Sequence, residues 1–204
     1  MAAAPLEHLR QRLGPVDVLV NNAGVGWRGP FGAMLAEEID RLLQVDLAGV
    51  LHTSRLVLPE MLERRRGHIV NVGSVAGRLG APFEAAYSAA KFGVAGFTEA
   101  LAVEVAPFGV HVAMVNPGPV DTGFADTGAP HTLRRPKPLP VDAVARAVLD
   151  AVDHPGLERV LPRWLRYAHI VRTLVPAAYV RGTRRAFASE LRAVERGWPR
   201  RQDG

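Results

Sequence analysis

Short apolar segments alternate with long helical segments along this chain, and this alternation limits the folds open to it. Apolar runs bounded by turn residues predict strands over Val16–Val20, Gly67–Val72, Val110–Val115 and, more briefly, Arg159–Leu161. Helical periodicity predicts a helix over residues 35–65. Further helices are predicted over residues 3–13, the back half of a helix that ends at Gly14-Pro15, over the alanine- and glycine-rich residues 84–106, over 141–152, and over a remainder that is interrupted at Pro176. Strands that alternate with helices form a parallel sheet covered on both faces. We therefore predict an α/β fold with a doubly wound parallel sheet, and a proline-rich loop over residues 119–140.

Polar or glycine-rich turns follow three of the predicted strands. They are Asn21-Asn22-Ala23-Gly24, the turn at Ser74, and Asn116-Pro117-Gly118. In parallel sheets the carboxyl ends of the strands share one edge, and ligands bind there. We therefore expect these turns to border one site.

A serine, a tyrosine and a lysine suggest what that site does. Tyr87 and Lys91 are four residues apart on a predicted helix and share a face. A phenol has a pKa of about 10, and a nearby ammonium group lowers it. Ser74 supplies a hydroxyl that can hold a substrate oxygen against the phenol. The alternative, a surface tyrosine and lysine without a role, requires all three residues to coincide by accident.

Together these motifs resemble the short-chain dehydrogenase/reductase family. The resemblance is carried by Asn21-Asn22-Ala23-Gly24, Ser74, Tyr87-x-x-x-Lys91, and Asn116-Pro117-Gly118 continuing to Thr122. It implies a Rossmann-like sheet and reversible hydride transfer between NAD or NADP and an alcohol, ketone or aldehyde. It also implies a homodimer or homotetramer, to which the small residues of helix 84–106 would contribute; the alternative is that they pack onto the chain's own sheet.

The resemblance also assigns roles. Tyr87 would be the general acid/base, Ser74 would orient the substrate oxygen, and Lys91 would lower the phenol pKa and bind the nicotinamide ribose. The cofactor would further contact the residues that flank these three: Asn22, Ala23, Gly24, Pro117, Gly118 and Thr122. No metal site is predicted, and Trp27, Phe83, Phe124 and Trp164 point to an apolar substrate.

Asp46 departs from the family pattern, which has asparagine in this position to hold a water near the lysine. Aspartate keeps an acceptor but loses the amide donor. Its charge is expected to pair with Lys91 and weaken the effect of the lysine on the phenol. The alternative is that aspartate holds the water as well as asparagine does.

A second departure concerns the first β-α units of the family, including its Gly-x-x-x-Gly-x-Gly turn, which have no counterpart here. The expectation is an N-terminally truncated sheet in which Val16–Asn22 forms an apolar edge strand. Three explanations are open: a misplaced gene start, an inactive relic, and a non-catalytic interaction module that uses this edge or the basic tail. Gly24-x-Gly26-x-x-Gly29 resembles a dinucleotide-binding turn, but Pro30 follows it and no second strand is predicted before residue 67.

Charge divides the chain into two parts. Residues 1–127 carry 10 basic and 13 acidic side chains, whereas residues 128–204 carry 15 basic and 7 acidic ones. We predict a dehydrogenase-like domain over 1–162 and a basic helical extension over 163–204. The extension mixes arginines with apolar residues; packing of an amphipathic helix is favoured over contact with an anionic membrane or closure over an apolar substrate. No nucleic-acid partner is predicted.

Composition adds two points. The chain has no cysteine, which excludes disulfides and thiol nucleophiles. It has neither the pattern of a signal peptide nor a run of 18 apolar residues, so the expected location is cytoplasmic.

Overall fold

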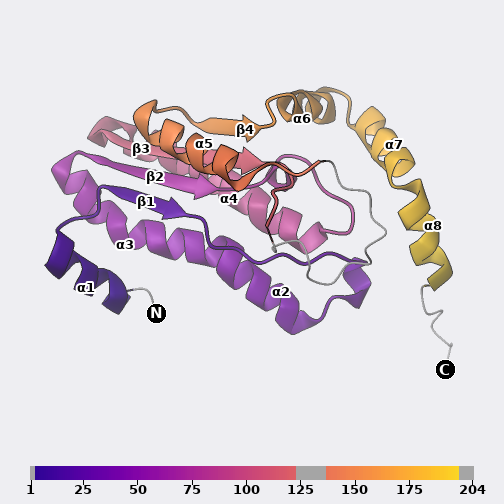
Figure 1. Ribbon diagram of the computed structural model, residues 1–204, viewed down its shortest axis with the longest axis horizontal. Coiled ribbons are helices and arrows are strands. Elements are labelled where there is room, and N and C mark those ends of the chain that lie inside the picture. Colours follow the sequence, from indigo (N-terminus) through magenta and orange to yellow (C-terminus); the bar gives the residue numbers. More distant parts are fainter. Residues whose placement is uncertain (1–2, 123–136, 198–204) are drawn as a thin grey trace.

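A computed structural model describes residues 3–122 and 137–197 of the protein (Figure 1). It contains a four-stranded parallel sheet in the order β1-β2-β3-β4. The strands are β1 (Val18–Asn21), β2 (Gly67–Val72), β3 (Val110–Pro117) and β4 (Glu158–Leu161). The predicted α/β fold with a Rossmann-like parallel sheet is confirmed.

One face of the sheet is covered by two long helices. These are α3 (Gly49–Arg64) and α4 (Ala85–Val105), with α1 (Ala3–Leu13) beside α3. Their apolar side chains meet those of the strands in a core that includes Met61, Ile69 and Leu101. The opposite face is covered by α5 (Val141–Asp153), whose Ala151 packs against Val70 and Val115. Helices on both faces make the sheet doubly wound.

Three further helices extend from the last strand to one side of the sheet (Figure 1). They are α6 (Leu165–Leu174), α7 (Pro176–Ala186) and α8 (Ala188–Gly197). Pro176 separates α6 from α7, as predicted, because proline has no N–H to continue the preceding helix.

The long helix predicted over residues 35–65 is present but not uniform. It consists of α2 (Ala36–Leu43), a π-helical turn over Gln44–Ala48, and α3. π-Helical turns insert one residue into a helix and often occur at functional sites. This turn contains Asp46, whose side chain is fully buried.

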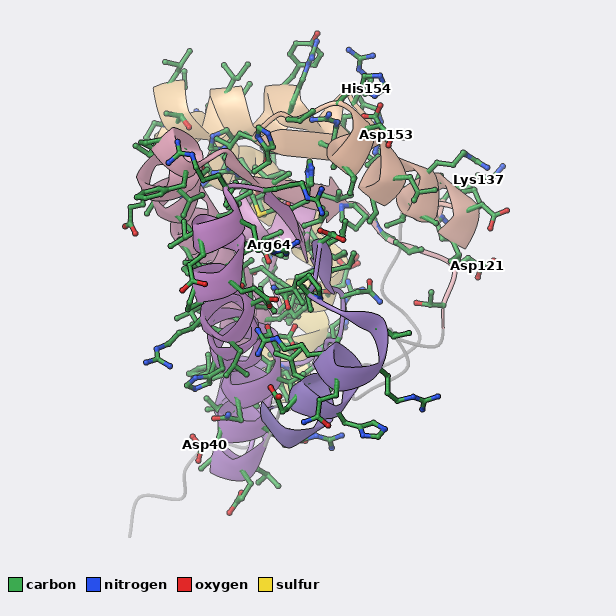
Figure 2. All side chains as sticks on the ribbon, turned by 90° about the vertical axis from the view of Figure 1, so that its left-hand side faces the viewer. Asp40, Arg64, Asp121, Lys137, Asp153 and His154 are labelled. Carbon is green, nitrogen blue, oxygen red and sulfur yellow. The ribbon has the colours of Figure 1, made fainter. Side chains whose placement is uncertain are left out.

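The remaining predicted boundaries are close to those observed. β1 begins at Val18, two residues later than predicted, and β3 extends to Pro117. Of the predicted loop 119–140 only the two ends are described, and Val120 pairs with Leu139 there. Figure 2 shows Asp121 and Lys137 on the same side of the molecule, near α5. Phe124 lies outside the described residues.

A polar network joins the carboxyl ends of β1 and β2 to the helices. The Asn21 amide donates to Asn71 Oδ1 at 2.8 Å, and the Asn71 amide donates to Thr98 Oγ1 at 2.9 Å. Asn71 and Thr98 are completely buried. Because every buried donor here has a partner, the network fixes the edge at which the predicted site lies without an energetic penalty.

β1 lies at an edge of the sheet, as predicted for Val16–Asn22. Leu19 packs into the core against α3. Val18 and Val20 point to the other face and are about two-fifths exposed, at 41% and 42%. Among the described residues no helix covers this part of that face.

Candidate active site

Ser74 lies where the chain leaves β2 at the carboxyl edge of the sheet. Its hydroxyl accepts a hydrogen bond from the Ala76 N–H at 3.1 Å, which caps a short helical turn over Val75–Gly77. The same hydroxyl is hydrogen-bonded to Tyr87. Ser74 is therefore held by the backbone in a position where it meets the phenol.

Tyr87 and Lys91 project from the first turns of α4 toward this serine. The Lys91 ammonium is buried, donates to the Val72 carbonyl at 3.3 Å, and lies 5.5 Å from the centre of the Tyr87 ring. Gly77 allows the close approach, because a Cβ at this position would lie 2.6 Å from the Lys91 carbonyl oxygen. The three residues that the sequence selected thus form one cluster.

Asp46 completes the cluster from the other side. Its Oδ2 lies 3.3 Å from Lys91 Nζ, and its Oδ1 accepts a hydrogen bond from the Val25 N–H at 2.7 Å. The predicted ion pair with Lys91 is confirmed. Burial raises the pKa of Asp46 above its ordinary value, against the lowering effects of Lys91 and the Val25 N–H.

The predicted decrease in the pKa of Tyr87 is not found. Burial, the largest effect, raises the pKa of this phenol, and the charges of Asp46 and Glu84 raise it further, whereas the hydrogen bond with Ser74 lowers it. The physical reason is first that burial disfavours the charged phenolate, and second that Lys91 is paired with Asp46, so that an anion accompanies the cation. The phenol therefore keeps its proton at neutral pH.

The other predicted site residues lie on two loops at the same edge. Asn22, Ala23 and Gly24 follow β1, and the Val25 N–H ties this loop to Asp46. Pro117 and Gly118 are buried at the end of β3, where the Gly118 N–H donates to the Leu161 carbonyl at 2.6 Å. Thr122 is exposed, four residues beyond Gly118. The strand register, with Asn21 opposite Asn71 and Val72 opposite Val115, brings these loops to either side of the cluster.

A second polar cluster borders the site and was missed by the sequence analysis. Buried Asn116 donates to Glu158 Oε1 at 2.5 Å, and Arg78 Nε donates to the same oxygen at 2.9 Å. Arg78 also pairs with Glu99 on α4 at 2.5 Å. The network connects β4, the loop after Ser74 and α4. Its members are far apart in sequence. The one local signal is Glu158, a charged residue at the start of β4.

The chain matches the sequence model described as short chain dehydrogenase over residues 2–131. It belongs to the short-chain dehydrogenase family. The family resemblance inferred from the cluster and the strand-end turns is thereby confirmed.

Individual relatives show the same likeness over part of their length. The chain is 42% identical over 121 residues to a 3-ketodihydrosphingosine reductase of Bacteroides thetaiotaomicron, which covers 59% of this chain and 45% of that protein. It is 42% identical over 113 residues to human 17-beta-hydroxysteroid dehydrogenase type 1, and this match covers 55% of this chain and 34% of that protein. The chain thus matches less than half the length of these two proteins.

A solved structure matches nearly the whole of this short-chain dehydrogenase chain. It is a short-chain dehydrogenase from Streptomyces avermitilis, with a TM-score of 0.73, 30% sequence identity, and coverage of 97% of this chain and 76% of that one.

In residues 3–122 and 137–197 no helix has both the length and the apolar character needed to cross a bilayer.

Proposed function

We propose that the protein is an NAD(P)-dependent oxidoreductase that interconverts an alcohol and a ketone or aldehyde. The observation that carries this proposal is the contact of Ser74, Tyr87, Lys91 and Asp46 at the carboxyl edge of a parallel sheet. A proton donor, a hydrogen-bonding hydroxyl and a buried cation are the groups that carbonyl reduction requires.

In this proposal Tyr87 exchanges a proton with the substrate oxygen. A phenol is protonated at neutral pH, so Tyr87 has a proton to donate as a carbonyl is reduced. Ser74, fixed by the Ala76 N–H, directs its hydroxyl to the same oxygen and aligns it with the phenol. Proton transfer by a positioned side chain contributes a factor of about 10²–10⁴ to rate.

The residues around the cluster fit the nicotinamide end of NAD(P). The buried Lys91 ammonium offers donors next to Tyr87, and the turn at Pro117 and Gly118 presents backbone close to the end of β3. We assign Lys91 and Tyr87 to the ribose, Pro117, Gly118 and Thr122 to the nicotinamide, and Asn22, Ala23 and Gly24 to the adenosine side. When bound, the nicotinamide would supply or accept the hydride. Among the described residues no glycine-rich turn leads from a strand directly into a helix to hold the pyrophosphate.

Asp46 is proposed to hold Lys91 in place and to keep the phenol protonated. Its carboxylate is within 3.3 Å of the ammonium and contributes to the raised pKa of Tyr87. This charge disfavours the phenolate, the form that would act as a base.

An apolar carbonyl compound is the proposed substrate. Phe83 packs against Phe187 with ring centres 6.2 Å apart, close to the start of α4, and Trp27 packs beside Tyr87. The two relatives named above are, by their names, enzymes of a sphingoid base and of steroids, both of which are largely apolar.

The proposal is tested by titrating the chain with NADH and NADPH and following the fluorescence of the nicotinamide. Binding, together with oxidation of the bound dinucleotide by apolar ketones, is expected. Failure to bind either dinucleotide would contradict the proposal and would support a non-catalytic interaction module instead. Replacement of Tyr87 by phenylalanine serves as the control, because it removes turnover but leaves the ribose contacts of Lys91.

We also propose that the chain forms a homo-oligomer through α4. Gly93 packs within the chain, since a Cβ built there would lie 2.9 Å from Leu47. Gly96 is exposed, and a Cβ built there would have no neighbouring atom within 4 Å. The exposed small residues Ala89 and Gly96 leave room for a second helix. Light scattering of the native chain and of Gly96→Leu tests this: the variant is expected to dissociate, and an unchanged mass would contradict the use of α4.

A further inference from the structure

α6 contacts the domain through Leu165, which lies close to Gly118, and through two polar residues. His169 Nδ1 is 3.4 Å from the Arg78 carbonyl oxygen, on the loop after Ser74. The Arg172 guanidinium lies 4.9 Å from the centre of the Phe92 ring, next to Lys91. The side of α6 that contacts the domain therefore carries a histidine and an arginine.

The apolar side of α6 faces solvent. Trp164, Tyr167, Val171 and Leu174 follow each other at intervals of three and four residues and share one face. They are 60%, 55%, 48% and 74% exposed, respectively. These four side chains are therefore not packed against the described part of the domain. A contiguous exposed apolar surface of this kind marks a site of interaction.

α7 continues the arrangement. Its inner side is fixed by Tyr179, whose hydroxyl donates to the Gly80 carbonyl at 3.1 Å. Because α6 and α7 are both held to the short loop at Arg78–Gly80, their outer sides point away from the domain. The outer side of α7 forms a shallow groove in which apolar and basic side chains alternate; it is lined by Pro176, Ala177, Val180, Arg181, Arg184 and Arg185.

Charge indicates what covers this surface. α6, α7 and α8 together carry seven arginines against two glutamates. Two copies of the chain that met through these helices would bring like charges together, which disfavours self-association. An apolar stripe with aromatic residues at one end and arginines beside it is instead typical of a helix that lies in the interface of an anionic bilayer.

We propose that the outer face of α6 and α7 binds the surface of a membrane that contains anionic lipids. The apolar side chains of α6 enter the boundary between headgroups and acyl chains, and Arg181, Arg184 and Arg185 contact lipid phosphates. This peripheral contact is independent of the proposed oxidoreductase activity, since none of these residues belongs to the catalytic cluster.

Flotation of the full chain with vesicles tests the proposal without any activity measurement. Vesicles of phosphatidylcholine alone are compared with vesicles that also contain phosphatidylserine. The chain is expected to float only with the latter, and to be released when salt is raised, because salt screens exposed charges. Flotation with neither vesicle, or equally with both, would overturn the proposal.

Matched variants separate the contribution of the arginine charges to membrane binding from that of the apolar side chains. In one, Arg181, Arg184 and Arg185 become glutamine; its control replaces the exposed arginines Arg41, Arg55 and Arg146 on α2, α3 and α5. At about fivefold per cation near the surface, the first variant should lose partitioning by about a hundredfold, and the control should lose much less.

In the second pair, Tyr167, Val171 and Leu174 become serine, and the exposed Leu13, Val103 and Leu149 become serine in the control. The α6 variant is expected to bind at least about tenfold more weakly than its control. Thermal unfolding confirms that each variant is folded. Equal losses in the tail variants and their controls would overturn the proposal, as would a lower mass in solution for the α6 variant than for its control, which would show that α6 pairs two copies of the chain.

Discussion

α4 and α6 contact the same loop, yet they are buried to very different extents. α4 buries apolar residues together with the polar Lys91 and Thr98, whereas no residue of α6 is buried and Leu174 is 74% exposed. The comparison shows that burial follows the partners available in the fold rather than the polarity of the side chain alone.

The partners account for the difference. Lys91 is buried where a carboxylate and a carbonyl meet its ammonium, which offsets the cost of removing the charge from water. Thr98 is buried where Asn71 donates to it. His169 and Arg172 of α6 likewise meet a carbonyl and an aromatic ring on the domain, but the apolar side of α6 has no such neighbour among the described residues.

The largest effect is expected from Tyr87→Phe, at the centre of the buried cluster. Removing the hydroxyl should decrease turnover by a factor of about 10²–10⁴, with little change in melting temperature. Tyr179→Phe, which removes the hydroxyl that binds Gly80 outside the cluster, is the control and should keep most of the turnover. Steady-state kinetics with an apolar ketone measure both. Similar turnover in the two variants would remove Tyr87 from its assigned role.

Substitution of one leucine in α4 and one in α6 compares how much each helix contributes to stability. Leu101 on α4 is 6% exposed and Leu174 on α6 is 74% exposed. Leu101→Ala should lower the free energy of unfolding by about 2–5 kcal/mol, and Leu174→Ala by about 0.5 kcal/mol or less. Denaturant unfolding measures both. A large loss for Leu174→Ala would mean that the α6 stripe is packed in the folded protein.

A third variant tests the polar network beneath the cluster. Thr98→Val leaves the buried Asn71 amide without its acceptor and should cost about 1–3 kcal/mol of stability. Thr173→Val on α6 removes an exposed hydroxyl that donates to the His169 carbonyl, and should change stability little. Thermal unfolding of both variants measures the difference. Equal melting temperatures would show that the hydrogen bond between Asn71 and Thr98 does not stabilise the fold.

The smallest effect in this series concerns Asp46 and the pH dependence of activity. Because the charge of Asp46 raises the pKa of Tyr87, Asp46→Asn should lower that pKa and move the pH profile of turnover toward lower pH. Asp40→Asn, on exposed α2, is the control and should leave the profile in place. An unshifted profile for Asp46→Asn would show that the carboxylate does not act on the phenol.

Asp46→Asn also has a stability signature whose sign follows from the raised pKa of this carboxyl. The native state binds the proton more tightly than the unfolded chain, so the contribution of Asp46 is fully present below its ordinary pKa of 3.8. This contribution is lost as pH rises through the folded-state pKa. The melting temperature of the native chain should therefore fall, relative to that of the variant, as pH rises above 3.8 and through the folded-state pKa. The opposite trend would indicate that the ion pair with Lys91 outweighs burial.

Much of the fold was readable from the sequence because its signals are local. The apolar run of β2, the turn residues after each strand and the period of α4 were sufficient to place these elements within two residues. The contact of Tyr87 and Lys91 also followed from helical spacing. The π-helical turn at Asp46 was not predicted, because the apolar pattern over residues 35–65 is that of one continuous helix.

The sequence by itself determined the family, the edge of the sheet at which the site is expected, and the identity of Ser74, Tyr87 and Lys91, since these depend on spacing along one chain. Only the tertiary structure decided the direction in which the pKa of Tyr87 shifts and the direction in which α6 presents its apolar side. Both depend on groups brought together from distant segments: Asp46 and Glu84 around the phenol, and Arg78, Gly80 and Phe92 beneath the tail. Electrostatic and packing energies act over a few ångströms of space, and the sequence alone does not specify which distant residues come that close.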